Sequence, residues 1–235
     1  MGKFQLIFLI LLTPILDQGI RTIDISADFR LHDIGEYERW YETSHPCEQH
    51  LEKAVYGLTE LNRHEIAQTK LVANPGCYPT ATILALAPAI AAGIIDLDIV
   101  VDAKSGVSGA GRKSEIKNLF SEVNENTFGY SVDGHRHLPE ITQELGSIAG
   151  SKSPKVVFVA HLIPITRGIL ASCYAPLGDR LALNRDAKKA EVKEIYADFY
   201  RGEPFVKVVA SPPMTKQTLG SNACLVYPTV DVRTN

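Results

Sequence analysis

"ANPGCYPTATILALAP", residues 73–88, joins a glycine, a cysteine and a proline to an apolar run, and this junction decides how the middle of the chain folds. Pro79 suits the first turn of a helix, where its missing N–H costs nothing. The residues from there to Ala92 are apolar on nearly every face, which is typical of a buried helix, and Gly93 is its expected stop. The stretch therefore predicts a buried helix that begins at or just after Cys77.

Cys77 is the residue of this junction that carries chemistry. Unpaired backbone N–H groups and the helix dipole at a helix start stabilise a thiolate, and the thiolate is the nucleophilic form of cysteine. Gly76 leaves room for a substrate carbonyl to approach, and the same N–H groups can hold an oxyanion. The alternative is a buried structural cysteine, and position alone favours neither interpretation.

The composition of the 235 residues limits the class of protein. A hydrophobic content of 45% and a charged content of 22% are typical of a soluble globular protein. The net charge of -3 offers no basic field for nucleic acid, so no nucleic-acid partner is expected. The four cysteines are scattered and include no CxxC pair, which indicates a reducing compartment, and we expect the cytoplasm.

The first 20 residues contain a short apolar run from Leu6 to Leu12. The run is too short to span a bilayer as a helix, so no membrane partner is expected. Three interpretations stay open: a secretory signal segment, a buried strand, or a start that is not native. No small-residue cleavage site follows the run, and the sequence continues directly into a globular pattern.

The rest of the chain alternates helical and strand-like patterns, which favours an α/β fold. Residues 184–202 have the apolar spacing of an amphipathic helix that ends at Gly202. Runs rich in Val, Ile and aromatic residues predict strands at 21–26, 99–103, 155–162, 169–175 and 205–210.

"GHRHLPEI", residues 134–141, is the segment that suits a proton partner for Cys77. His135 and His137 flank an arginine, and Glu140 is close enough in sequence to orient one of them. In an extended segment the two imidazoles point the same way, because side chains repeat every two residues. A metal site is the alternative, but no third ligand follows at a telling spacing. A Cys–His pair for acyl transfer fits better, and no metal is expected.

"DAKSGVSGAGRKS", residues 102–114, follows a predicted strand and imitates two phosphate-binding motifs. Compared with a phosphate loop, it has Arg112 where a lysine is required. Compared with a dinucleotide fingerprint, it has Ser114 in place of the third glycine. What remains is a hydroxyl-rich loop in which Arg112 and Lys113 suit a small phosphate or carboxylate, or else a mobile surface turn.

Taken together these motifs carry a resemblance. "NPGCYPT", "SGVSGAGR" and "GHRHLPEI", with "IDISADFRL", "HLIPITRGI" and "GSN", resemble the N-acetyl-gamma-glutamyl-phosphate reductase family of arginine biosynthesis, in the family's order from about Pro14 to Asn222. The resemblance implies a partial Rossmann-type dinucleotide-binding domain over 1–76. It further implies an α+β substrate domain of the glyceraldehyde-3-phosphate/semialdehyde dehydrogenase type over 77–215, and a truncated return to the first domain over 216–235.

The resemblance also implies a reaction. An oxidoreductase of this family reduces N-acetyl-gamma-glutamyl phosphate to N-acetylglutamate 5-semialdehyde with NADPH, by way of a cysteinyl thioester. Cys77 matches the family's nucleophile, and His137 matches its acid/base, with His135 beside it. The residues expected at the acyl phosphate are Ser105, Gly106, Arg112 and Arg167, the two arginines because of their charge. Asn222 is expected near the nicotinamide.

The sequence departs from the family at both ends. Residues 1–20 contain no glycine-rich pyrophosphate loop, and the helix with which the family continues does not follow "GSNACLVYPTVDVRTN". We therefore expect a truncated chain in which NADP has lost its main anchor.

Two rival hypotheses remain. One is an inactive, cofactor-free remnant that keeps only the substrate and oligomerisation domain. The other is a sister enzyme that reduces aspartyl phosphate or a carrier-bound aminoadipyl phosphate. In all of them the resemblance implies a homo-oligomer that forms through the sheet of the substrate domain.

Overall fold

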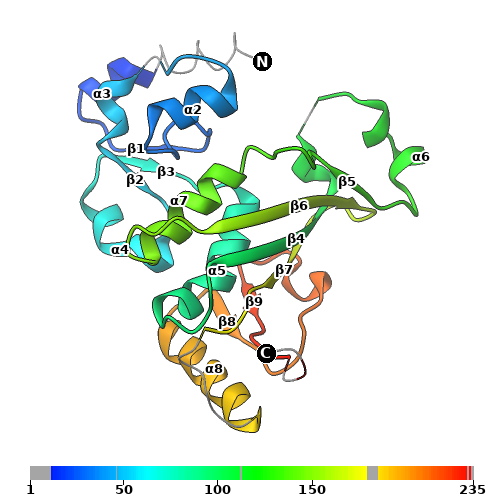
Figure 1. Cartoon of the computed structure of the whole chain (residues 1–235). Helices are drawn as coiled ribbons and strands as arrows, with labels where there is room; N and C mark the ends of the chain where they lie inside the picture. Colours follow the sequence, from blue (N-terminus) through cyan, green and yellow to red (C-terminus); the bar gives the residue numbers. More distant parts are fainter. Residues whose placement is uncertain (1–11, 46, 112, 179–184, 232, 234–235) are drawn as a thin grey trace. The chain divides into compact units, whose positions relative to one another are not determined.

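The computed structural model describes residues 12–45, 47–111, 113–178, 185–231 and 233. Of the apolar run from Leu6 to Leu12, residues 6–11 lie outside the described residues, as does Arg112. The chain divides into two compact units, Met1–Gly76 and Cys77–Asn235, and each is a body of its own (Figure 1).

The first unit is built on a parallel sheet of three strands. The strand order is β1 (Thr22–Asp24), β3 (Leu71–Ala73), β2 (Ala54–Tyr56). The connections carry the helices α2 (Ile34–Tyr41), α3 (Glu48–Leu51) and α4 (Thr59–Gln68). Parallel strands need crossover connections of this kind, and the α/β fold class predicted from the sequence is confirmed.

A buried polar network fills the carboxyl end of β1, where the motif "IDISADFRL" lies. The Ser26 hydroxyl lies 2.8 Å from a carboxylate oxygen of Asp24 and 2.8 Å from one of Asp28. Burial raises the pKa of Asp24. Arg30 Nε donates to the carbonyl of Asn74 over 2.8 Å, and the N–H of Asn74 donates to the carbonyl of Asp24 over 2.8 Å. The network thus fixes the backbone that leaves β3 just before the second unit begins.

The second unit is built on a mixed sheet with the strand order β5–β6–β4–β7. Its two central strands, β4 (Asp98–Gly106) and β6 (Lys155–Ile163), are parallel. The outer strands β5 (Phe128–Tyr130) and β7 (Ile169–Tyr174) run antiparallel to them. The strands expected from the Val- and Ile-rich runs at 99–103, 155–162 and 169–175 are confirmed.

Helices and a second, smaller sheet complete this unit. α5 (Cys77–Ala91) packs on β7 and on α7 (Leu138–Ile148), and α7 also contacts β6 (Figure 1). α8 (Arg185–Phe199) is the amphipathic helix predicted from the sequence. Strand β9 (Cys224–Val226) pairs in parallel with β8 (Val206–Val208), and short helical turns, including α6 (Phe120–Val123), lie between β4 and β5.

The helix predicted after residue 76 is confirmed. α5 runs through Pro88, and the chain turns after it at Gly93, whose φ of 63° is left-handed. Pro88 has no N–H to offer the carbonyl of Leu84 one turn earlier. The Tyr200 hydroxyl donates to that carbonyl instead, over 2.5 Å. A side chain from beyond α8 therefore makes the hydrogen bond that the proline cannot.

The residues of β4 show which face of the mixed sheet is covered. Val101 and Ala103 are fully buried, whereas Val100, Asp102 and Lys104 between them keep part of their surface in solvent. Successive side chains of a strand point to opposite faces. The sheet thus has an inner face, on the side of α5 and α7, and an open outer face.

Candidate active site

Cys77 is the first residue of α5, and its side chain is exposed. It lines a cavity of about 870 Å³ that is formed entirely by the second unit. Cys47, by contrast, is buried, and burial raises the pKa of Cys173 to about 12. An exposed sulfur at a helix start is the arrangement that favours a thiolate, so a buried structural role for Cys77 is wrong.

The loop after β4 forms one wall of this cavity and includes two predicted substrate residues. Ser105 and Gly106 both line the cavity, and the Ser105 hydroxyl donates to the carbonyl of Gly106 over 3.0 Å. The N–H of Gly106 donates to the carbonyl of Gly168 over 2.9 Å. A Cβ at Gly106 would lie 2.8 Å from the backbone N of Arg167, so only glycine lets the two loops approach this closely.

A second wall comes from residues 212–215 and 221–230. Asn222, expected from the resemblance near the nicotinamide, is exposed here, and Met214 and Thr215 stand on the same wall. The structure therefore brings three predicted residues, Ser105, Gly106 and Asn222, into the same cavity as Cys77.

The two predicted arginines are placed differently. Arg167 is exposed, and in the part of the chain that the structure describes its backbone packs on Gly106 while its side chain is not part of the cavity wall. Arg112 lies outside the described residues. The anion-holding role of Arg167 and Arg112 stays a prediction.

The two histidines lie in a turn that leads into α7. His137 stands directly before the helix with φ −83° and ψ −11°, so the segment does not have the extended conformation in which the two imidazoles would point the same way. The N–H of His137 donates to Nδ1 of His135 over 3.0 Å, and the two ring centroids are 4.8 Å apart. Because Nδ1 of His135 accepts this bond, the neutral ring carries its proton on Nε2.

His135 is enclosed by aromatic rings. Tyr78, Tyr130 and Phe158 meet its ring edge-on at centroid distances of 5.6, 5.6 and 5.2 Å. Burial, and secondarily the charge of Arg136, lowers the pKa of His135 to about 4. His135 is therefore neutral at physiological pH. The acid/base role of His137 stays a prediction.

Tyr78 links Cys77 to the histidine turn. It follows Cys77 in the chain, and its ring centroid lies 6.0 Å from that of His137. Its hydroxyl accepts a hydrogen bond from the Tyr130 hydroxyl over 3.0 Å and donates to the carbonyl of His161 over 3.3 Å. The histidines are not among the described residues that line the cavity, and they reach the nucleophile's helix through Tyr78.

Sequence reasoning missed both tyrosines. Tyr78 stands inside "NPGCYPT", and that position was the available signal. Tyr130 offered none, because it reaches the site through the pairing of β5 with β6, where Tyr130 lies opposite Ala160.

The described residues lack two features, a metal-binding cluster and a membrane-spanning helix. They contain no group of three or more His, Cys, Asp and Glu side chains that is placed to hold a metal ion. No helix among them has both the length and the apolar character needed to cross a membrane.

Residues 77–235 match the family model described as semialdehyde dehydrogenase, dimerisation domain. This match covers more than half of the chain, and the chain belongs to the semialdehyde dehydrogenase family.

Curated relatives point to one branch of that family. N-acetyl-gamma-glutamyl-phosphate reductase of Dehalococcoides mccartyi strain 195 is 52% identical over 221 residues, and that of Pelotomaculum thermopropionicum is 51% identical over 220 residues. The alignments cover 94% and 92% of this chain but 63% and 61% of the two relatives. The chain thus spans about three fifths of the length of these relatives, and the resemblance carried by its motifs is confirmed.

Solved structures agree on the fold. Aspartate semialdehyde dehydrogenase II from Vibrio cholerae superimposes with a TM-score of 0.64 at 17% identity, covering 96% of this chain and 68% of that one. A second structure of that enzyme, complexed with ASA, gives a TM-score of 0.57 at 17% identity, covering 89% of this chain and 62% of the other. At this identity the likeness concerns the fold alone.

Proposed function

We propose that this chain carries the acyl-transfer site of an N-acetyl-gamma-glutamyl-phosphate reductase. The observation that carries the proposal is the exposed Cys77 at the start of α5, in a cavity shared with Ser105, Gly106 and Asn222. Relatives with that name, at about half identity over nearly the whole chain, support this substrate class.

The first half of the proposed reaction is acyl transfer. The Cys77 thiolate attacks the acyl carbon, a C–S bond forms, and the C–O bond to phosphate breaks, so that inorganic phosphate leaves with the electron pair. The oxyanion of the tetrahedral intermediate forms at the amino end of α5, where the helix dipole favours negative charge. His137 takes the proton of the thiol and returns it in the second half of the reaction.

A nicotinamide fits beside this site. Asn222 offers an exposed carboxamide in the cavity that Cys77 also lines. NADPH, when bound, supplies the hydride that reduces the thioester to the aldehyde. We further propose that the first unit, with its parallel sheet, is the remnant of a dinucleotide-binding domain.

A sister enzyme that reduces aspartyl phosphate is the second candidate. The likeness of the fold to aspartate semialdehyde dehydrogenases favours it, at 17% identity. The 52% identity to an N-acetyl-gamma-glutamyl-phosphate reductase favours the first candidate, as does the family's order of motifs.

Single-turnover acylation tests the proposal without NADPH. The chain is mixed with N-acetyl-gamma-glutamyl phosphate, and phosphate release and the mass of the peptide that contains Cys77 are measured. We expect one thioester on Cys77 and one phosphate per chain, and loss of both by at least about a thousandfold in Cys77→Ser. Faster acylation by aspartyl phosphate would reassign the substrate, and no acylation by either would support the inactive remnant.

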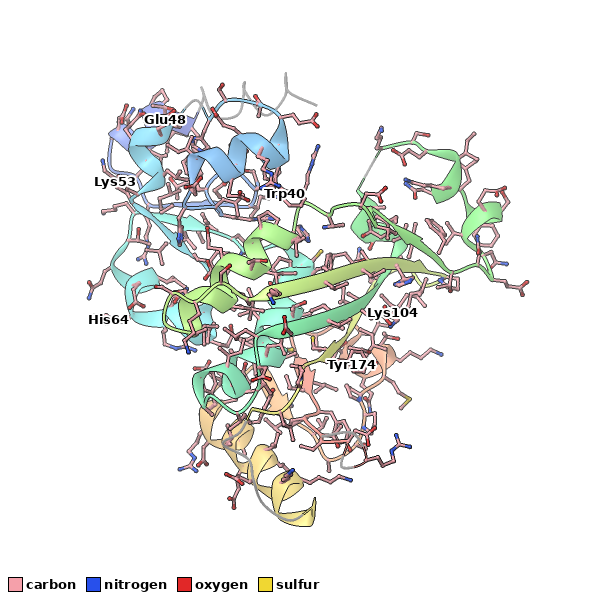
Figure 2. All side chains as sticks on the ribbon, in the orientation of Figure 1. Trp40, Glu48, Lys53, His64, Lys104 and Tyr174 are labelled. Carbon is pink, nitrogen blue, oxygen red and sulfur yellow. The ribbon has the colours of Figure 1, made fainter. Side chains whose placement is uncertain are left out.

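We also propose that two copies of the chain associate through the outer face of the mixed sheet. The family model that matches residues 77–235 is a dimerisation domain. Val100 and Val157 on the central strands and Tyr174 on the outer strand β7 lie on this face. They are 43%, 58% and 60% exposed, which is unusual for large apolar side chains. Figure 2 shows Tyr174 and Lys104 on neighbouring strands of this sheet.

Light scattering across a concentration series tests this association. We expect a dimer, and we expect Val157→Lys to shift it to monomer, because a lysine would bring unpaired charge into the contact. Val132→Lys is the control, since Val132 is 64% exposed but lies outside the sheet. A monomeric wild type, or equal dissociation of the two variants, would contradict the proposed face.

A further inference from the structure

We infer that Tyr130 is a positioning residue for the reaction, which ties the start of α5 to the histidine turn. The inference rests on the proposed function, since it concerns how Cys77 and His137 are held in register. Tyr130 comes from a third element, β5, and it makes one contact with each of the other two.

The first contact is the hydrogen bond to Tyr78. The carbonyl of His161 can only accept, so the Tyr78 hydroxyl donates to it and has lone pairs left for Tyr130. The Tyr130 hydroxyl is accordingly the donor in the 3.0 Å bond between the two phenols. This directed chain of hydrogen bonds fixes the ring of Tyr78, and Tyr78 is the residue next to the nucleophile.

The second contact is with His135. The ring of Tyr130 meets the ring of His135 at 5.6 Å with an interplanar angle of 65°. His135 in turn accepts the backbone N–H of His137, so a displaced His135 ring would release the start of α7. The position of His137 therefore depends on the aromatic enclosure to which Tyr130 contributes.

Tyr130 is itself well anchored for this role. Tyr130 pairs with Ala160 of β6, and Ala160 is buried on the inner face. Burial, followed by the bond to Tyr78, raises the pKa of the Tyr130 phenol, so it remains a neutral donor over the pH range of an enzyme assay. A neutral phenol next to Tyr78 and His135 can hold these groups in place, and its proton is engaged in the bond to Tyr78.

The test is the reactivity of Cys77 in the full chain with iodoacetamide, followed site by site by mass spectrometry from pH 5 to 9. For Tyr130→Phe, which keeps the ring and removes the hydroxyl, we expect Cys77 to react on the order of threefold to tenfold more slowly at neutral pH. The pH midpoint of alkylation should also move to higher pH, because a loosened His137 takes the thiol proton less readily. The melting temperature should change little.

Tyr78→Phe removes the same hydrogen bond by deleting the acceptor instead of the donor. It allows the positioning role to be tested even if Tyr130→Phe is unstable. If the two phenols act through one bond, the double variant Tyr78→Phe, Tyr130→Phe is no slower than the slower single variant. Tyr41→Phe is the matched control, since Tyr41 belongs to α2 in the first unit and does not line the cavity of Cys77, and it should leave the profile unchanged.

The outcomes separate the inference from the proposed function. If Cys77 in the wild type reacts no faster than Cys47, Cys173 and Cys224, the nucleophile assignment fails, and the role of Tyr130 fails with it. If Cys77 is the fast thiol but Tyr130→Phe has the wild-type profile, only the positioning role is overturned. A slower rate with an unchanged pH midpoint would also overturn it, since that result indicates a general structural defect.

Discussion

The two faces of the sheet β5–β6–β4–β7 take their side chains from the same strands but have opposite characters. On the inner face of β6, Phe158 and Leu162 are buried. On its outer face, Val157 is mostly exposed and His161 lies 3.1 Å from the carboxylate of Asp102. One strand thus contributes to an apolar enclosure on one side and to an open, partly charged surface on the other.

The contrast is sharpest between two histidines. His135, against the inner face, is surrounded by rings, and burial lowers its pKa to about 4. His161, on the outer face, has a carboxylate beside it, and that carboxylate also contacts Lys104. The same side chain type is held neutral on one face and offered a negative partner on the other, because the first is desolvated and the second is paired. The face of the sheet on which a histidine lies, rather than the residue type, therefore sets its environment.

Replacing one histidine at a time should give the largest difference between the two faces, measured as the acylation rate of Cys77. His137→Asn removes the proposed acid/base, and we expect single-turnover acylation of Cys77 to slow by on the order of a hundredfold. His161→Asn, on the outer face, should stay within about twofold of the wild type. Phosphate release in a quenched-flow experiment measures both rates, and equal slowing of the two variants would remove the functional contrast between the faces.

The pH dependence of stability should come next in size. His135 has a folded-state pKa of about 4 and an ordinary value of 6.5, so the unfolded chain binds the proton first as the pH falls. The contribution of neutral His135 to the free energy of unfolding is complete above pH 6.5 and is lost as the pH drops towards 4. We expect a loss of about 2 kcal/mol, allowing for the partial exposure of the ring. Urea unfolding at pH 7 and pH 4.5 measures it, and His135→Gln should flatten the difference. If His135→Gln loses as much unfolding free energy between pH 7 and pH 4.5 as the wild type does, the pH dependence comes from other residues.

The charged pair on the outer face should have the smallest effect on the isolated subunit. Lys104 and Asp102 are half-buried and in contact, and we expect Lys104→Met to change the free energy of unfolding by less than about 1 kcal/mol. Lys155→Met is the control, since the pair of Lys155 and Asp98, at 3.6 Å, is more exposed. Chemical unfolding at a concentration where the chain is monomeric measures both variants. A larger loss for Lys104→Met would mean that the outer face matters to the fold of one subunit.

Several parts of this structure were open to prediction because they depend on local sequence. The Val- and Ile-rich runs predicted β4, β6 and β7, and the apolar run after Cys77 predicted α5. The position of Cys77 at a helix start followed from the neighbouring Pro79 alone. Local patterns suffice here because propensity, helix capping and side-chain periodicity act over a few residues.

Other features of the structure could not be predicted from the sequence. The sequence did not show that the segment from His135 to His137 forms a turn, in which the His137 N–H donates to the His135 ring. Tyr130 had no signal in the sequence, since strand pairing brings it to Tyr78. The anion-holding role of Arg167, inferred from its charge, stays a prediction, since its backbone packs on Gly106 and its side chain is exposed.

The sequence by itself determined the ancestry of this protein, the α/β class of its fold and the place of Cys77 at the start of a helix, because each depends on residues that are adjacent or in a fixed order. Only the tertiary structure decided which histidine is held neutral, which tyrosine supports the site and which face of the sheet is left open. Those properties depend on desolvation and on contacts between strands and helices that are distant in the chain, and no local pattern encodes them.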